Sequence, residues 1–203
     1  MEDLLILVDK DDNEIGYEKK LETHINGHLH RAFSVFVFDW SDETMLLQKR
    51  ALGKYHSGGL WSNACCSHPR KGEAMEDAVN NRLAAELGFH SSCHIVDSAA
   101  SGTLLNGTDI IYYCGKFKYY ADFDNLREHE IDNVFLYSPY NNRLSKSDFV
   151  FNPEEIAELK WIKIEDLKQW LKNDPHAFSA WFKPAFELAY DVLCRQFDNF
   201  HSL

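Results

Sequence analysis

The segment His30-Arg-Ala-Phe-Ser-Val-Phe-Val-Phe-Asp39 contains the longest nearly apolar run in this sequence, from Ala32 to Phe38. Its aromatic and β-branched residues are typical of a strand that is buried on both faces. Residues 45–49, Met-Leu-Leu-Gln-Lys, follow the polar stretch 40–44 and are expected to pair with it as a hairpin. A membrane-spanning helix needs about 20 apolar residues, so we expect no membrane span.

The segments on either side of this hairpin add further strands and helices. A helix is predicted over 74–87, because apolar residues recur every fourth position from Met75 to Leu87 and Gly88 follows as a stop signal. Residues 52–60 form a glycine-rich loop before it. Further strands are expected at 4–8, 94–100, 109–120, 130–137 and 156–162, and further helices at 165–172 and 183–197. This order predicts an α+β fold, with a mixed or antiparallel β-sheet flanked by helices.

Length and composition are those of an ordinary globular chain. The 203 residues are 45% hydrophobic and 26% charged. Domains usually span about 100–200 residues, so one domain is expected over residues 1–203. The net charge of −11 argues against nucleic-acid binding, which usually needs a basic face. The first residues, Met-Glu-Asp-Leu-Leu, lack the basic and apolar regions of a signal peptide, so a cytoplasmic location is expected.

A cysteine and a histidine lie close together in the segment Trp61-Ser-Asn-Ala-Cys-Cys-Ser-His-Pro69. Cys66 and His68 are two residues apart, so their side chains share one face if the segment is extended. The pair suits a thiolate–imidazolium nucleophile, or a thiol beside a metal-bound histidine. A buried structural thiol is the ordinary alternative, because cysteine is often buried.

Other histidines and two glutamates suggest a metal site. His24, His28 and His30 are clustered, and Glu128 and Glu130 share one face if their segment is a strand. Together with the histidine after the cysteine pair, they would form a mixed nitrogen and oxygen site for Mg²⁺, Mn²⁺ or Zn²⁺. Spacing does not choose between His24 and His28. For any one of these residues alone, a solvated side chain is the ordinary alternative.

Several charged residues lie next to these segments in sequence. Glu86 is near the C-terminal end of the predicted helix, where the helix dipole disfavours a negative charge, so its presence needs another reason. Lys20, Arg50, Lys54 and Arg82 could bind a diphosphate through charge-assisted hydrogen bonds. Solvated surface charge is the ordinary alternative for each of them.

In this order the motifs resemble those of the type 1 isopentenyl-diphosphate isomerases, which belong to the Nudix fold superfamily. The resemblance covers nearly the whole chain from about Leu5 onward. It rests on the segments 30–38, 46–51, 61–69, 128–132, 152–156 and 181–183.

The Nudix box of this chain is recognisable but degenerate. Glu73, Glu86 and Gly88 fall in its register, whereas Arg82 and Ala85 stand where the box has glutamate. Hydrolysis uses those carboxylates to bind the ions that activate water, so their loss argues against ordinary Nudix hydrolysis.

The resemblance implies a role for each matching residue, and it favours His24 over His28. The implied ligands of a divalent metal are His24, His30, His68, Glu128 and Glu130, with Glu86 on a second Mg²⁺ that arrives with the diphosphate. The implied catalytic residues are Cys66, Glu130 and Tyr119. The implied substrate contacts are Lys20, Arg50, Lys54, Arg82 and Trp181. The chain departs from the family at Ser57-Gly58, where an aromatic residue and a proline are usual.

The implied activity belongs to isoprenoid biosynthesis. It is the conversion of isopentenyl diphosphate to dimethylallyl diphosphate through a tertiary carbocation, with Cys66 on one face and Glu130 with Tyr119 on the other. The sequence leaves open which residue transfers the first proton. The alternative is a Nudix hydrolase of a nucleoside or prenyl diphosphate. In either case the expected partner is a small diphosphate and not a nucleic acid.

Overall fold

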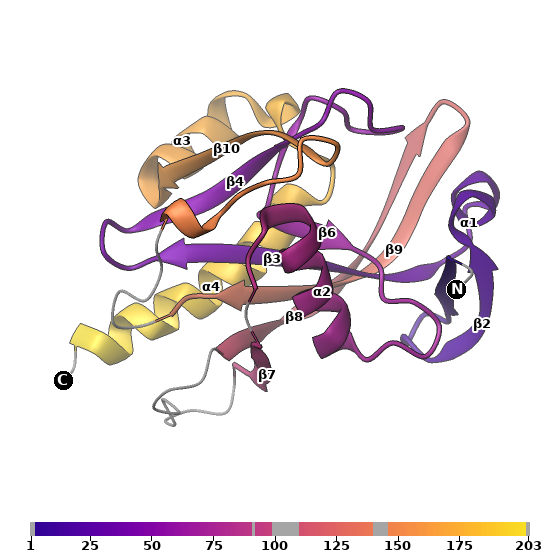
Figure 1. The fold of residues 1–203 in the computed structure, drawn as a ribbon, viewed down its shortest axis with the longest axis horizontal. Coiled ribbons are helices and arrows are strands. Elements are labelled where there is room, and N and C mark those ends of the chain that lie inside the picture. Colours follow the sequence, from indigo (N-terminus) through magenta and orange to yellow (C-terminus); the bar gives the residue numbers. More distant parts are fainter. Residues whose placement is uncertain (1–2, 91, 99–109, 140–145, 202–203) are drawn as a thin grey trace.

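A mixed β-sheet runs through the middle of the protein, with helices on both faces (Figure 1). The structure, a computed structural model, describes residues 3–90, 92–98, 110–139 and 146–201. The main strands, in sheet order, are β10 Ile156–Lys163, β4 Thr44–Arg50, β3 His30–Asp39, β9 Leu126–Tyr137, β8 Ile110–Phe123 and β7 His94–Asp97. Strand β3 pairs parallel to β9 and antiparallel to β4, so the sheet is mixed, as the sequence predicts.

The central strand β3 is buried on both faces, which confirms the prediction from its composition. Val35 and Val37 pack on the same side as helix α2, Met75–Leu87. Phe36 and Phe38 pack on the opposite side against helix α4, Phe182–His201. Because fully burying such a side chain contributes about 1.5–3 kcal/mol, this strand is a major part of the core that holds both layers together.

The other predicted elements form with small shifts of their ends. The last predicted strand and the helix after it are β10 and α3, Ile164–Asn173. The predicted strand at 4–8 is β1, Leu4–Val8. The predicted strand ends at 99–100 and 109 lie outside the described residues. In the described part of the chain, no helix is long and apolar enough to cross a membrane.

Four short elements around the N-terminus and the cysteine pair were not predicted. Strand β2, Glu14–Lys19, is mostly exposed, and helix α1, Lys20–Asn26, has only seven residues. Strands β5, Trp61–Ser62, and β6, Cys65–Ser67, are shorter still. Elements this short show little hydrophobic periodicity in the sequence. Tertiary contacts, and not an apolar face of their own, hold them in place.

Strand register brings distant parts of the sequence together at one end of β3. His30 on β3 stands beside Glu130 on the parallel strand β9. Ser34 on β3 stands opposite Cys66 on β6. The predicted metal and catalytic segments therefore meet at one place in the sheet.

Candidate active site

One pocket contains nearly all of the residues that the sequence singles out. Its walls come from β3, β4, β6, β8, β9 and α2, together with the loop at 51–60. The predicted site residues that line it are Lys20, Arg50, Lys54, Cys66, His68, Arg82, Glu86, Tyr119, Glu128, Glu130 and Trp181. The remaining two, His24 and His30, are fully buried beside it, in contact with residues of its wall.

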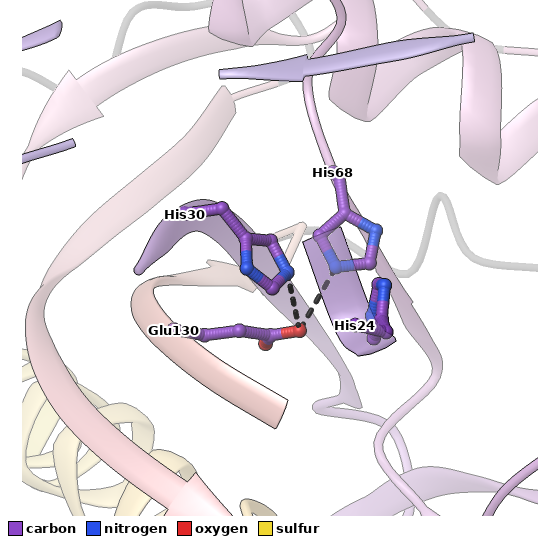
Figure 2. Close-up of side chains that lie close together, drawn as sticks. All are labelled: His24, His30, His68 and Glu130. Atoms are coloured by element: carbon purple, nitrogen blue, oxygen red, sulfur yellow. Dashed lines mark hydrogen bonds and ion pairs between the residues drawn. The ribbon is translucent and has the colours of Figure 1, made fainter. Parts of the chain in front are cut away.

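Three buried imidazoles surround one carboxylate (Figure 2). His24, His30, His68 and Glu130 each offer a ligand atom, and these atoms lie within 4.8 Å of one another. The Oε1 atom of Glu130 is 2.9 Å from Nε2 of His68 and 3.2 Å from Nε2 of His30. Three imidazoles with one carboxylate are a donor set that suits a divalent transition metal better than Mg²⁺, which prefers oxygen ligands.

The hydrogen bonds of two of these histidines leave a ring nitrogen available. Nδ1 of His24 lies 2.6 Å from the carbonyl of Lys20, and Nδ1 of His30 lies 2.9 Å from the carbonyl of His28. A carbonyl accepts a hydrogen bond, so Nδ1 carries the proton and Nε2 keeps its lone pair. Nε2 of His24 is buried with no hydrogen-bond partner among the described residues. A metal ion would supply the missing partner.

Electrostatics favour the ligand forms of His24, His68 and Glu130. At His30 burial is outweighed by the hydrogen bond to Glu130, which raises the pKa of this imidazole, so a metal ion would have to displace its second proton. Burial lowers the pKa of His24 to about 4, so its imidazole is neutral at pH 7. Burial opposes ionisation of Glu130, but His68 and His30 outweigh it and hold the pKa of this carboxyl well below its usual value. Neutral imidazoles and an ionised carboxylate are the forms that bind metal.

His24 and His28, the two histidines between which the sequence spacing does not choose, occupy different positions in the structure. His24 lies in the buried cluster, on α1. The side chain of His28 is half exposed, and its Nδ1 lies 2.8 Å from Glu18. The structure therefore brings His24 to the cluster and leaves His28 at the surface.

Glu128 lies outside this first group of four. It belongs to a second group with His24 and His56, and its Oε1 atom is 2.8 Å from Nε2 of His56. Its other oxygen is 2.9 Å from the hydroxyl of Tyr119. As predicted, Glu128 and Glu130 share one face of β9, because both carboxylates reach the same tyrosine.

Cys66 lies near a guanidinium, yet its surroundings keep it protonated. Nη1 of Arg50 is 3.6 Å from its Sγ atom. Burial raises the pKa of the Cys66 thiol to about 12; Arg50 opposes this rise, and Glu86 and Glu128 reinforce it. A neutral thiol can donate a proton but is a poor nucleophile.

An aromatic ring forms part of the same pocket wall as the thiol. The ring centroid of Trp181 lies 5.3 Å from the guanidinium carbon of Arg50 and 6.2 Å from the ring of Tyr119. Its indole N–H donates to Oδ1 of Asn63 at 3.1 Å. Because the polar edge of the indole is occupied by Asn63, its position is fixed relative to the pocket.

The candidate phosphate contacts lie near helix α2 and the carboxylate of Glu86 on that helix. Arg82 donates to Glu86 at 2.6 Å, one helical turn away, which gives the buried Glu86 a reason to lie near the end of the helix. Lys54 binds Glu155, a residue that the sequence analysis did not single out. These cations are thus held close together by carboxylates at the pocket wall.

Among the other pocket residues that the sequence analysis missed, Asp132 and His56 are titratable. The Oγ atom of Ser34 donates to Oδ2 of Asp132 at 2.8 Å, and Oδ1 of Asp132 is buried without a hydrogen-bond partner in the described chain. Burial, reinforced by Glu130, raises the pKa of Asp132 well above its usual value. Strand alternation from Glu130 could have revealed Asp132. His56 lies in an irregular loop, so no sequence period could have indicated that its side chain points into the pocket.

Comparison with known proteins places this fold in a class. The family model described as NUDIX domain matches residues 28–182, so the chain is a NUDIX domain protein. The solved structure of DR0079 from Deinococcus radiodurans shares the fold, with a TM-score of 0.56 at 15% identity over 91% of this chain and 96% of that one.

Two curated relatives define the family more narrowly. The Isopentenyl-diphosphate Delta-isomerase of Burkholderia multivorans is 42% identical, over 93% of this chain and 94% of that protein. Isopentenyl-diphosphate Delta-isomerase 2 of Photorhabdus laumondii is 41% identical, over 90% of each chain. The chain belongs to the isopentenyl-diphosphate Delta-isomerase family, which confirms the family predicted from its motifs.

Proposed function

We propose that this protein converts isopentenyl diphosphate to dimethylallyl diphosphate, using a divalent metal, as a step of isoprenoid biosynthesis. Family membership supports this activity. The observation that carries it is that a protonated thiol and a carboxylate–tyrosine pair line one pocket, namely Cys66, Glu130 and Tyr119. Acid–base isomerisation needs these groups, whereas ordinary Nudix hydrolysis needs box carboxylates that this chain lacks.

The donors beside the pocket fit a bound metal. His24, His30, His68 and Glu130 would hold the ion, and Nε2 of His24 is buried without a hydrogen-bond partner among the described residues that would compete for it. Glu128 would join them from the adjacent group. When bound, the ion supplies positive charge that stabilises the ionised carboxylates of the site.

The reaction transfers one proton to the substrate and removes another. Cys66 donates its Sγ proton to the terminal alkene carbon, and the π electrons form the new C–H bond, which leaves a tertiary cation at C3. Glu130 then accepts a proton from C2, and the electrons of that C–H bond form the new double bond. Tyr119 holds Glu130 in position through its hydroxyl. Exchange with solvent returns the proton to Cys66 and removes the one on Glu130.

The cationic intermediate needs electron-rich surroundings, whereas the diphosphate needs positively charged ones. The ring face of Trp181 stabilises the carbocation by a cation–π contact of about 2 kcal/mol in a desolvated site. The diphosphate is bound by cationic side chains through charge-assisted hydrogen bonds. Glu86 would hold a second Mg²⁺, which would supply further positive charge to the diphosphate. The proposed diphosphate contacts are Lys20, Arg50, Lys54 and Arg82.

The test is to incubate the metal-loaded protein with isopentenyl diphosphate and Mg²⁺ in D₂O. We expect dimethylallyl diphosphate with deuterium in the new methyl group, because the incoming proton comes from an exchangeable thiol. Proton and phosphorus NMR detect the label and any free phosphate. Release of phosphate without isomer would replace the proposal with the hydrolase alternative, and isomer without solvent label would exclude this acid–base scheme.

A further inference from the structure

His56 is a buried histidine that lies beside the proposed metal centre but outside the four-residue cluster. It belongs to the loop between β4 and β5, and only 8% of its surface is exposed. Its ring lies 5.3 Å from the ring of Phe123 and 6.0 Å from that of Trp181, measured between centroids. The loop therefore turns a polar side chain inward, toward β9, where burial has to be offset by a hydrogen bond.

That hydrogen bond is made to Glu128. Nε2 of His56 lies 2.8 Å from Oε1 of Glu128, and the hydroxyl of Tyr119 lies 2.9 Å from Oε2. His56 donates to one oxygen of Glu128. Tyr119 shares its single hydroxyl proton between the other oxygen and Oε2 of Glu130, 2.7 Å away. Both oxygens thus have a donor within reach, each from a different element of the fold. A carboxylate held at both oxygens has little freedom to rotate, so its orientation is set before any ligand binds.

His56 and Glu128 do not form a second cation site of their own. The group that contains them shares His24 with the first group. Nδ1 of His24 is occupied by the carbonyl of Lys20, so His24 offers only Nε2, and one nitrogen binds one ion. Without His24, only two protein ligands would remain, which is fewer than the three or four protein ligands of zinc sites.

We propose that His56 is a positioning residue of the metal centre, which donates its Nε2–H to Glu128 and fixes the direction in which that carboxylate faces the bound ion. The inference rests on the metal centre of the proposed function. Partners of metal ligands typically contribute 10–100-fold to metal affinity. The affinity of the centre therefore depends on a hydrogen-bond donor at position 56.

Mn²⁺ binding to the metal-free protein tests this. His56→Leu keeps apolar volume but removes the donor, and we expect it to weaken Mn²⁺ binding by about 10–100-fold. His56→Gln keeps an N–H donor, and we expect it to retain most of the affinity. Calorimetric titration measures the dissociation constants. Thermal unfolding of each metal-free variant shows whether the fold is kept.

A matched control and a double mutant separate positioning from other roles. His94→Ala removes a histidine that pairs with a carboxylate, Glu76, away from the pocket, and it should leave Mn²⁺ binding unchanged. In a Glu128→Ala background, His56→Leu should have no further effect, because His56 acts only through Glu128.

The possible outcomes distinguish this inference from the proposed function. Equal losses with and without Glu128 would make His56 a direct ligand or a general structural residue, and would overturn the inference. Unchanged Mn²⁺ binding by His56→Leu, or failure of His56→Gln to retain affinity, would also overturn it. If the wild-type protein bound no Mn²⁺ at all, the metal centre of the proposed function would itself be wrong.

Discussion

Tyr119 and Glu130 stand directly opposite each other on the antiparallel strands β8 and β9, and the tyrosine hydroxyl lies 2.7 Å from Oε2 of the carboxylate. Burial, reinforced by Glu128 and Glu130, raises the pKa of Tyr119 well above its usual value. The hydroxyl is therefore protonated throughout the physiological range and acts as a donor. Its position fixes the carboxylate that we propose as the base.

Replacing Tyr119 by Phe removes this donor and keeps the ring. A hydrogen bond to a charged group contributes about 1.5–3 kcal/mol, so we expect kcat to fall by about 10–100-fold. Steady-state assays of isomer formation measure the change. Tyr120→Phe is the matched control, because that neighbouring side chain is exposed and its hydroxyl contacts Asp122. Unchanged kcat in Tyr119→Phe would remove Tyr119 from the mechanism.

His68→Ala should lose metal and isomerase activity together. It removes an imidazole that contacts Glu130 in the buried cluster, and the remaining donors bind an ion less tightly. His28→Ala should retain both properties, because His28 is paired with Glu18 at the surface. Elemental analysis of both variants checks this, with equimolar metal expected in the wild-type protein. An active wild-type protein that contained no metal would contradict the prediction.

Two glycines with positive φ should differ in their tolerance of alanine. Gly88 ends α2 at φ 63°, and a Cβ atom there would lie 2.7 Å from the carbonyl oxygen of Val150. At Gly72, with φ 74°, no atom of the described residues beyond its own chain neighbours lies within 4 Å of the same position. A left-handed backbone costs a non-glycine residue about 1–2 kcal/mol, and a steric clash adds about 1–3 kcal/mol.

We therefore expect Gly72→Ala to lose about 1–2 kcal/mol of unfolding free energy and Gly88→Ala about 2–5 kcal/mol. Urea denaturation of the two variants beside the wild-type protein measures both values. Equal losses of unfolding free energy in the two variants would show that backbone strain alone accounts for the destabilisation. Val150 would then move away from the added Cβ atom without a measurable energetic cost.

The sequence predicts the parts of this site that follow a regular period. Alternation along a strand places Glu128 and Glu130 on one face, and the composition of β3 predicts its burial. Strand register, which brings His30 beside Glu130, depends on pairing between residues far apart in sequence and has no local signal. His56 was missed for a related reason, because the loop that carries it has no period from which its direction could be read.

The protonation state of Cys66 determines whether it donates a proton or attacks as a nucleophile. A thiol must keep its proton for the first role and lose it for the second. Arg50 favours the thiolate from 3.6 Å, but burial, supported by Glu86 and Glu128, outweighs it and raises the pKa to about 12. Because this pKa is raised, the neutral thiol predominates at neutral pH and gives way to thiolate only in strong alkali. We expect Cys66→Ser to keep the fold and metal but to reduce isomerisation severely, since a hydroxyl is a far weaker acid.

The rate at which iodoacetamide alkylates Cys66 reports its thiolate fraction, and peptide mass spectrometry assigns the modification to this residue. Between about pH 6 and pH 11 the rate should keep rising without a plateau, because a thiol with a raised pKa still gains thiolate throughout this range. Cys66→Ser provides the background from the other four cysteines. An inflection for Cys66 at about pH 6, with the plateau reached by about pH 7–8, would mean a thiolate at neutral pH, since acidified cysteines titrate in that region. Cys66 would then act as a nucleophile, and the proposed proton donor would have to be another group.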